Sequence, residues 1–308
     1  MQRPSQSITL IGAPLEEGAS RPGCSMGPKA LRVAGIAEAL TALGHSVSDA
    51  GDVVPHEVEI GFPGNARNPE IVTGFARALD AAGRQALEEG RTAVFLGGDH
   101  AIAFGTVAAA LANAAALGRK LHVIWLDAHS DFNTPATSTS GNMHGMPAAF
   151  FCGEPGFEGL LECPKLPPAN FHLVGARSID PAEVELLDAR GADVNDMAVI
   201  DEHGIGAVMR RILAEAERDD ALLHVSLDVD FIEPDIAPGV GTIVPGGATF
   251  REAHLAMEMI GRTGRMASLD LVELNPFLDD RGKSARLMVE LTASAFGRRI
   301  FDRPTQPA

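Results

Sequence analysis

The chain has 308 residues, of which 45% are hydrophobic and 21% are charged, and its formal net charge is −16. This composition excludes a disordered chain, because it supplies enough apolar residues for a large buried core. The charge argues against non-specific binding to nucleic acid or anionic lipid, because Lys and Arg are too few to neutralise phosphates. A cationic small molecule is the kind of ligand that this charge favours.

The cysteines and the N-terminal sequence indicate a protein of the cytoplasm. Cys24, Cys152 and Cys163 form no C-x-x-C pair, and an odd number of cysteines does not suggest a disulfide framework. The apolar run at residues 8–13 is interrupted by Pro14 long before it could span a bilayer or act as a secretory signal. We therefore expect neither a membrane span nor export.

Short apolar runs alternate with longer Ala-rich stretches, which is the pattern of βαβ units and a parallel sheet. Several of the longer stretches have Pro in the first turn and Gly just past the end, as helices do. In chain order we predict a strand at 8–12, helices at 28–43 and 69–89, a strand at 93–96, a helix at 102–117, strands at 121–126 and 171–174, helices at 181–189 and 205–217, a strand at 222–227, a helix at 250–261, a strand at 266–272 and a helix at 284–296. All belong to one predicted domain, residues 1–308.

A long polar loop follows the predicted strand at 121–126. Residues 132–145, called the polar loop below, are rich in Thr, Ser, Asn and Gly. A loop of this length inside a compact domain is usually functional. The alternative is a surface loop with an ordinary polar composition.

Acidic residues and histidines follow four of the predicted strands at the points where the strands end. The strand at 93–96 runs into G-G-D-H, the strand at 121–126 into D-A-H-S-D, the strand at 222–227 into D-V-D, and the strand at 266–272 into Glu273. Ligands of open parallel sheets bind in the crevice beyond the carboxyl ends of the strands. Four separate segments therefore direct acids and imidazoles to one place.

Six of these residues form a candidate metal site. In D-x-H-x-D and D-x-D the polar residues are two apart, so they project on one side of an extended strand. Four carboxylates packed together would repel each other unless cations neutralise them, and two divalent ions balance four negative charges. A ligand set of carboxylates and imidazoles without thiolates favours Mn²⁺ or a similarly hard ion, and metal-assisted hydrolysis. The candidate ligands are His100, Asp127, His129, Asp131, Asp228 and Asp230.

The alternative for each aspartate is a structural one. A single Asp at a strand end is more often a turn residue or a helix cap than a ligand, but the combination of three motifs in one α/β chain favours the metal site. We interpret Asp99 as a turn residue or a residue that supports the ligands. The remaining histidines are interpreted as surface or core residues: His45, His56, His122, His172, His203, His224 and His254.

These motifs are similar to those of arginases in the ureohydrolase superfamily. The similar segments are G-G-D-H at 97–100, D-A-H-S-D at 127–131, S-L-D-V-D at 226–230 and E-L-N-P at 273–276. The resemblance runs from residue 8 to about residue 296 and implies a three-layer α/β/α sandwich with a mainly parallel sheet of about eight strands. It also implies hydrolysis of L-arginine to L-ornithine and urea by a homotrimer or homohexamer.

By the same resemblance, each subunit would hold two Mn²⁺ ions. His100 and Asp131 would bind the first ion, His129 and Asp230 the second, and Asp127 and Asp228 both. A hydroxide bridging the ions would attack the substrate, and Asp131 would accept a hydrogen bond from it.

The polar loop resembles the segment with which arginases hold the amino-acid end of their substrate. Its neutral donors would bind the α-carboxylate, and they would discriminate because a missing partner leaves buried polar groups unpaired. These donors are Asn133, Ser138, Ser140 and Asn142.

Five further residues receive roles from the resemblance. Asp180 and Glu183 would face the α-ammonium, although both could equally be first-turn helix residues favoured by the helix dipole. Thr242 would contact the substrate from a nearby turn. Glu273 would pair with the guanidinium, and His144 would shuttle a proton to the departing amine.

The chain departs from the common arginase pattern at two places. Ser178 stands where many members carry an acid, and G-V-G-T-I at 239–243 replaces the usual threonine- and proline-bearing version of that turn, although Thr242 is retained. Three alternative hypotheses for the function remain. A hydrolase of agmatine or another guanidino compound would not need the polar loop, a single-zinc deacetylase would not need this ligand set, and a non-catalytic binding protein should have lost a ligand or Glu273.

Overall fold

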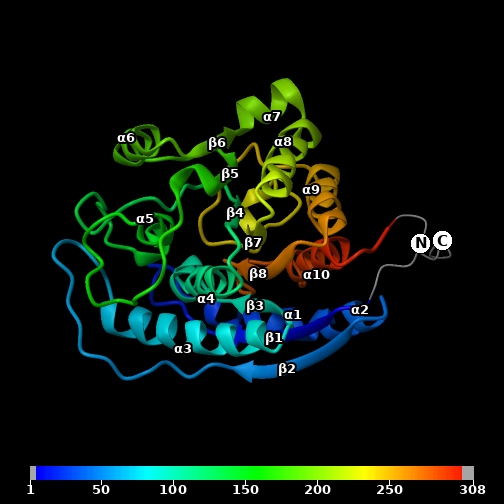
Figure 1. The fold of residues 1–308 in the computed structure, drawn as a ribbon, viewed down its shortest axis with the longest axis horizontal. Coiled ribbons are helices and arrows are strands. Elements are labelled where there is room, and N and C mark those ends of the chain that lie inside the picture. Colours follow the sequence, from blue (N-terminus) through cyan, green and yellow to red (C-terminus); the bar gives the residue numbers. More distant parts are fainter. Residues whose placement is uncertain (1–4, 300–308) are drawn as a thin grey trace.

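Eight parallel strands form one sheet, in the order β2-β1-β3-β8-β7-β4-β5-β6. The structure is a computed structural model that describes residues 5–299. Helices cover both faces of the sheet (Figure 1), so the predicted three-layer α/β/α sandwich with a mainly parallel sheet is confirmed. Residues 1–4 and 300–308 of the predicted domain lie outside the described residues, and one domain over 1–308 remains our proposal.

The six predicted strands are confirmed to within a few residues, and two further strands complete the sheet. The additional strands, β2 and β6, are its two edges and have the polar sequences S-V-S-D-A-G-D and D-V-N-D. Edge strands need no continuous apolar run, because they are not covered on both faces as central parallel strands are. The strands are β1 (Ser7–Ala13), β2 (Ser46–Asp52), β3 (Thr92–Gly97), β4 (Leu121–Leu126), β5 (Phe171–Ala176), β6 (Asp193–Asp196), β7 (Leu222–Asp228) and β8 (Met266–Val272).

The predicted helix at 28–43 is wrong, because two helices occupy that stretch. Gly35 lies between them with φ of 89°, a left-handed conformation that glycine adopts easily and that ends a helix. The other predicted helices are confirmed, while α5 and α7 were missed because six or seven residues show too little periodicity. The helices are α1 (Gly27–Val33), α2 (Ile36–Thr41), α3 (Pro69–Glu88), α4 (Ala103–Ala116), α5 (Pro147–Cys152), α6 (Pro181–Arg190), α7 (Met197–His203), α8 (Ile205–Arg218), α9 (Phe250–Thr263) and α10 (Lys283–Ala295).

The central strands are apolar throughout because each faces two hydrophobic cores. Val94 and Leu96 of β3 pack into the core under α1, α2 and α7–α10, whereas Phe95 packs into the core under α3–α6. The two sets of helices lie on opposite sides of the sheet in Figure 1. Burial on both faces holds the strand ends in fixed positions, which a site at those ends requires.

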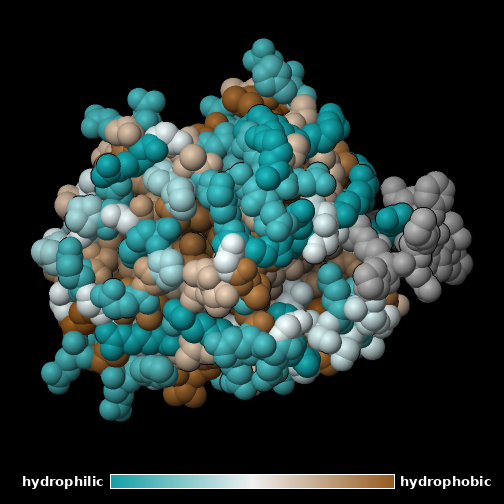
Figure 2. All heavy atoms as spheres, viewed as in Figure 1, coloured by the Kyte–Doolittle hydropathy of each residue, from teal (hydrophilic) through white to brown (hydrophobic). Residues whose placement is uncertain are grey.

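The face of the molecule shown in Figure 2 is mainly polar. Most residues that face the viewer in Figure 2 are hydrophilic. Within residues 5–299, no helix combines the length and apolar character needed to cross a membrane.

Candidate active site

The four motifs meet because the strands that precede them are neighbours. Strands β3, β8, β7 and β4 are consecutive in the sheet, and parallel strands end at the same edge. His100, Asp131, Asp228 and Glu273 thereby come together in one cavity of about 410 Å³, a volume suited to a small-molecule ligand. The predicted convergence at the carboxyl ends of the strands is confirmed.

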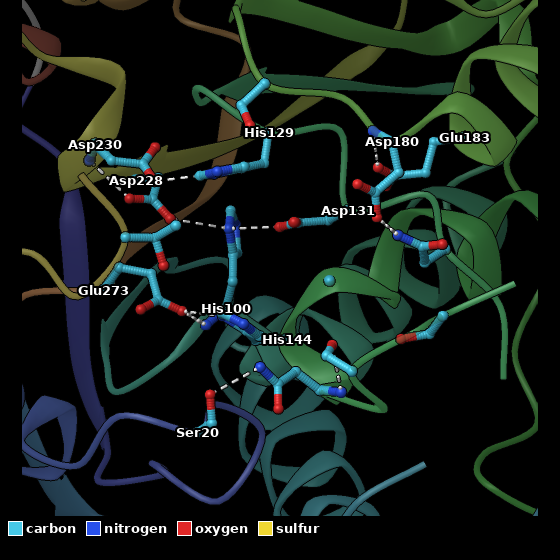
Figure 3. Close-up of a pocket in the computed structure, with 17 residues that line it drawn as sticks. Ser20, His100, His129, Asp131, His144, Asp180, Glu183, Asp228, Asp230 and Glu273 are labelled. Carbon is cyan, nitrogen blue, oxygen red and sulfur yellow. Dashed lines mark hydrogen bonds and ion pairs between the residues drawn. The ribbon is translucent and has the colours of Figure 1, made fainter. Parts of the chain in front are cut away.

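A buried group of three carboxylates surrounds one nitrogen of His100. The Nδ1 atom lies 3.0 Å from Oδ2 of Asp127, 3.0 Å from Oδ2 of Asp131 and 3.3 Å from Oδ2 of Asp228. In Figure 3 the dashed lines from His100 lead to Asp131 on one side and to Asp228 on the other. One imidazole nitrogen thus shares a small space with three acids.

A second group shares Asp127 with the first. The Nδ1 atom of His129 lies 3.0 Å from Oδ2 of Asp230 and 3.5 Å from Oδ1 of Asp127. Among residues 5–299, two sets of side chains have ligand atoms close enough to hold a metal ion, and Asp127 belongs to both: His100, Asp127 and Asp131, and Asp127, His129 and Asp230.

The chemistry of these groups fits bound cations. Asp127 Oδ2 and His100 Nδ1 are buried and make no hydrogen bond within the described part of the chain, although they lie 3.0 Å apart. Burial, together with neighbouring carboxylate charges, raises the pKa of Asp131 to about 6 and the pKa of Asp228 well above its usual value. Divalent cations would satisfy the unpaired atoms and keep these acids ionised.

The structural role of the aspartates is compatible with the predicted ligand role, because each carboxylate has two oxygens. Oδ1 of Asp127 accepts from the backbone N–H of His129 at 2.7 Å, and Oδ1 of Asp228 accepts from that of Asp230 at 2.7 Å. Their Oδ2 atoms face His100. Asp99 is a turn residue, as predicted: its two oxygens accept from the N–H groups of residues 101 and 19.

Two site residues have a backbone conformation that is rare outside glycine. Asp131 has φ of 49° and Glu273 has φ of 62°. Such conformations cost about 1–3 kcal/mol and are concentrated at functional sites. The surrounding packing therefore holds both carboxylates in orientations that a relaxed backbone would not favour.

Glu273 forms an ion pair with His144, and both residues line the cavity. Oε1 of Glu273 accepts from the backbone N–H of His100 at 2.8 Å and from Nδ1 of His144 at 2.9 Å. Burial alone would lower the pKa of His144, but the charge of Glu273 and this hydrogen bond raise it to about 9. Conversely, His144 outweighs the effect of burial and lowers the pKa of Glu273. Both groups are charged at neutral pH.

The polar loop lines the same cavity as the acids. Figure 3 shows an end with Asp228, Asp230 and Glu273 and a far end with Asp180 and Glu183. All predicted site residues except the deeper Asp127 line the cavity, including Asn133, Ser138, Ser140, Asn142 and Thr242.

Glu183 has a structural role that accounts for its whole carboxylate. Oε1 accepts from Ser130 Oγ at 2.7 Å and from the N–H of Phe132 at 2.8 Å, while Oε2 accepts from the N–H of Asp180 at 2.9 Å. The last bond is half of a capping box at the start of α6. The helix alternative is therefore correct for Glu183, and its contact with a substrate stays a prediction.

Sequence reasoning missed several residues that shape the site. Ser20 lines the cavity, and its Oγ accepts from Nδ2 of Asn142 at 3.1 Å. Ser226 and Trp125 hold His100: Ser226 Oγ lies 2.7 Å from Nε2, and the Trp125 ring stacks on the imidazole with centroids 4.0 Å apart. Ser20 had no sequence signal because it lies in an ordinary loop, and Trp125 had none because it lies inside an apolar strand. Ser226 begins the S-L-D-V-D segment, but no role was predicted for it.

Ser226 is expected to fix the proton on Nε2 of His100, which leaves Nδ1 free to bind a cation. The substitution Ser226→Ala should weaken metal affinity by about 10- to 100-fold, the usual effect of removing a hydrogen-bond partner of a histidine ligand. Titration with a competing chelator measures the affinity directly. The control is Ser268→Ala, because Ser268 Oγ lies 2.7 Å from Nδ1 of His224, a core histidine. Equal affinities in both variants would contradict this role.

The other core histidines have structural partners away from the cavity, as predicted. His122 Nδ1 and His172 Nε2 lie 2.8 Å apart, and His172 Nδ1 lies 2.7 Å from Asp193 Oδ2. His224 contacts Ser268 and Asp270. Their places within the strands explain why none reaches the carboxyl edge of the sheet.

The fold and the site define a class of protein: α/β/α enzymes with a buried, carboxylate-rich centre at the carboxyl edge of a parallel sheet. The family model described as the Arginase family matches residues 6–297. The arginase of Brucella melitensis is 50% identical over 303 residues, covering 96% of this chain and 98% of that protein. The chain therefore belongs to the arginase family, and the prediction of an enzyme of this family is confirmed.

Solved structures agree with this assignment. The arginase of Bacillus cereus superposes with a TM-score of 0.88 at 38% identity, covering 96% of this chain and 100% of that one. The arginase of Entamoeba histolytica, in complex with L-ornithine, superposes with a TM-score of 0.86 at 28% identity, covering 97% of this chain and 100% of that one.

Proposed function

We propose that this protein is an arginase that hydrolyses L-arginine to L-ornithine and urea at a centre of two Mn²⁺ ions. The observation that carries the proposal is a single cavity that is lined both by the candidate metal ligands with Glu273 and by the neutral donors of the polar loop, with Asp180 and Glu183 at the end away from Glu273 (Figure 3). Such a cavity suits a substrate with a cation at one end and an amino-acid group at the other. The Entamoeba histolytica relative binds L-ornithine, which has the same amino-acid group.

The two groups that share Asp127 would hold the ions. His100 and Asp131 would bind one ion, His129 and Asp230 the other, and Asp127 and Asp228 would bridge them. When bound, the ions would generate a nucleophile from water at neutral pH. Mn²⁺ is our choice because the site offers carboxylate oxygens and imidazole nitrogens and no thiolate ligand.

Glu273 would orient the guanidinium. Its pKa is lowered, so it is ionised at neutral pH, and a carboxylate can accept two parallel N–H bonds from a planar guanidinium. The bond that breaks joins the guanidinium carbon to the side-chain nitrogen of the ornithine part. The oxygen of water becomes the oxygen of urea.

His144 would donate the proton that the departing amine needs. It lines the cavity beside Glu273 and, with a pKa of about 9, carries a proton at neutral pH. A histidine in this position can return to its protonated state from water after each turnover.

At the far end, Asn133, Ser138, Ser140 and Asn142 would donate hydrogen bonds to the α-carboxylate, and Asp180 would face the α-ammonium. Asn133 Nδ2 donates to Asp180 Oδ2 at 3.1 Å. The proposed contact of the α-carboxylate, Asn133, therefore lies beside the proposed contact of the α-ammonium, Asp180. Thr242 and Glu183 complete the proposed set of contacts.

The choice between substrates gives the experiment that tests the function. With the Mn²⁺-loaded protein, we expect kcat/KM for L-arginine to exceed that for agmatine by at least about 100-fold, because agmatine has no α-carboxylate and leaves the loop donors unpaired. Urea release measures both reactions. A preference for agmatine would assign the site to another guanidino hydrolase, and full activity in verified metal-free protein would reject the metal centre.

We also propose that the protein acts in the cytoplasm as a homotrimer or homohexamer. The basis for the oligomer is the resemblance to arginases, and the basis for the location is that the three cysteines form no C-x-x-C pair or disulfide framework, as in proteins of a reducing compartment. Light scattering would give the mass of the particle in solution.

A further inference from the structure

Residues 64–68, called the 64–68 segment below, lie against the polar loop. The backbone N–H of Asn65 donates to the carbonyl of Pro135 at 2.7 Å, and that of Arg67 donates to the carbonyl of Gly141 at 2.8 Å. The two bonds reach the two ends of the stretch that carries Ser138 and Ser140. The segment therefore holds this stretch along its length.

The side chain of Asn65 adds contacts in the middle of that stretch. Its Nδ2 atom donates to the carbonyls of Ser138 at 3.2 Å and Thr139 at 3.1 Å. An asparagine amide has two N–H donors, so one side chain can serve both carbonyls. Asn65 thus fixes the backbone between the two serines that line the cavity.

The close approach of the two chains depends on glycine on both sides. A Cβ atom on Gly64 would lie 2.4 Å from the carbonyl oxygen of Pro135, and Gly64 has φ of 117°. A Cβ atom on Gly141 would lie 2.4 Å from Oδ1 of Asn65, and Gly141 has φ of 76°. Larger residues at either position would separate the segment from the loop.

The 64–68 segment is itself held by the body of the protein. Nδ2 of Asn68 donates to the carbonyl of Glu17 at 2.9 Å, and helix α3 begins at the next residue. Buried residues of α3, such as Phe75 and Leu79, belong to one of the two main cores. The polar loop is therefore connected through Asn65 to a rigid element.

The position of the loop determines where its hydroxyl groups point. Oγ of Ser138 accepts from the N–H of Gly141 at 3.0 Å, and Oγ of Ser140 accepts from the N–H of Asn142 at 3.2 Å. Because both oxygens accept from the backbone, both O–H groups can donate to a ligand in the cavity. Movement of the 138–141 backbone would misplace both donors together.

We propose that Asn65 is a positioning residue for substrate specificity, which holds the polar loop so that Ser138 and Ser140 can bind the α-carboxylate of an amino acid. This inference rests on the proposed function, because it needs a substrate with such a carboxylate. Asn65 is not among the residues that line the cavity, and its side chain contacts the backbone of the loop, through which it would act.

The test is the substitution Asn65→Ala in the full-length, Mn²⁺-loaded protein. We expect KM for L-arginine and Kd for L-ornithine, measured by calorimetry, to rise by about 5- to 30-fold, the effect of losing two exposed hydrogen bonds. The kcat and the metal content should stay within about twofold, because neither the ions nor Glu273 is touched. Gly64→Ala should change KM and Kd in the same direction. Glu59→Ala, an exposed change in the same connection between β2 and α3, is the control and should leave both constants unchanged.

Hydrogen exchange of the polar loop separates this inference from the proposed function. In Asn65→Ala, backbone amides of residues 136–142 should exchange at least about fivefold faster than in Glu59→Ala. Unchanged exchange, or unchanged KM and Kd with wild-type activity present, would overturn the positioning role. If the wild-type protein neither hydrolyses L-arginine nor binds L-ornithine, the proposed function fails and the specificity role fails with it. In that case faster exchange would still show that Asn65 holds the loop.

Discussion

Replacement of Glu273 by Gln is expected to lower kcat/KM for L-arginine by about 100- to 10,000-fold. The variant keeps the shape of the side chain but loses the negative charge that would accept two hydrogen bonds from the guanidinium, each worth about 1.5–3 kcal/mol when a charged group takes part. It also removes the charge that keeps His144 protonated. Steady-state kinetics of urea release would measure the loss, with metal content measured on the same samples.

The matched control for this prediction is Glu154→Gln. Glu154 is also buried, and its carboxylate pairs with Arg190, outside the cavity. This variant should lose some thermal stability and keep kcat/KM within about twofold. If Glu273→Gln stayed within tenfold of the wild type, Glu273 would not be the group that holds the guanidinium. If the Glu273→Gln variant lost its metal instead, the role of Glu273 would be to support His100, since its carboxylate accepts a hydrogen bond from the backbone N–H of His100.

Replacement of Asp228 by Asn should cost metal as well as activity. Asp228 is 2% exposed, its Oδ2 faces His100, and its Oδ1 holds the N–H of Asp230. An amide can still accept that backbone bond, but its nitrogen cannot bridge two cations, so we expect less than one bound ion per subunit in place of two. Activity should fall at least about 1,000-fold. Elemental analysis after dialysis gives the stoichiometry.

Asp270→Asn provides the comparison for Asp228. Asp270 is equally buried but contacts Thr106 and His224 in the core, so its replacement should lower stability and leave the metal content unchanged. Two ions per subunit in Asp228→Asn would move the bridging role to another residue.

The sequence predicted the centre of the molecule better than its edges. The apolar strands and the acids that follow them identify both the sheet and the site, because covering a strand on two faces leaves a continuous apolar run. Strands β2 and β6 were not predicted, because edge strands have no such run. The predicted helix at 28–43 is divided at Gly35, because a glycine can lie within a helix or end it. Local sequence patterns therefore predict the buried strands and the helices of the core, but not the edge strands or the residues at which helices end.

Contacts between loops were outside the reach of sequence reasoning. Ser20 reaches Asn142, and Asn65 reaches Ser138, across separations of 122 and 73 residues. No periodicity links such pairs, because they depend on where the sheet places each loop. The roles of the polar loop could be inferred from a resemblance, whereas the residues that hold the loop in place had to be found in the structure.

The stack of Trp125 on His100 makes the protein a natural optical sensor of its own centre. The chain has one tryptophan and no tyrosine, so its near-ultraviolet emission comes almost entirely from an indole that lies 4.0 Å, centroid to centroid, from a proposed ligand of the ions. A paramagnetic ion bound to His100 should quench this emission. Loading and loss of Mn²⁺ could then be followed in real time, without a label and without substrate.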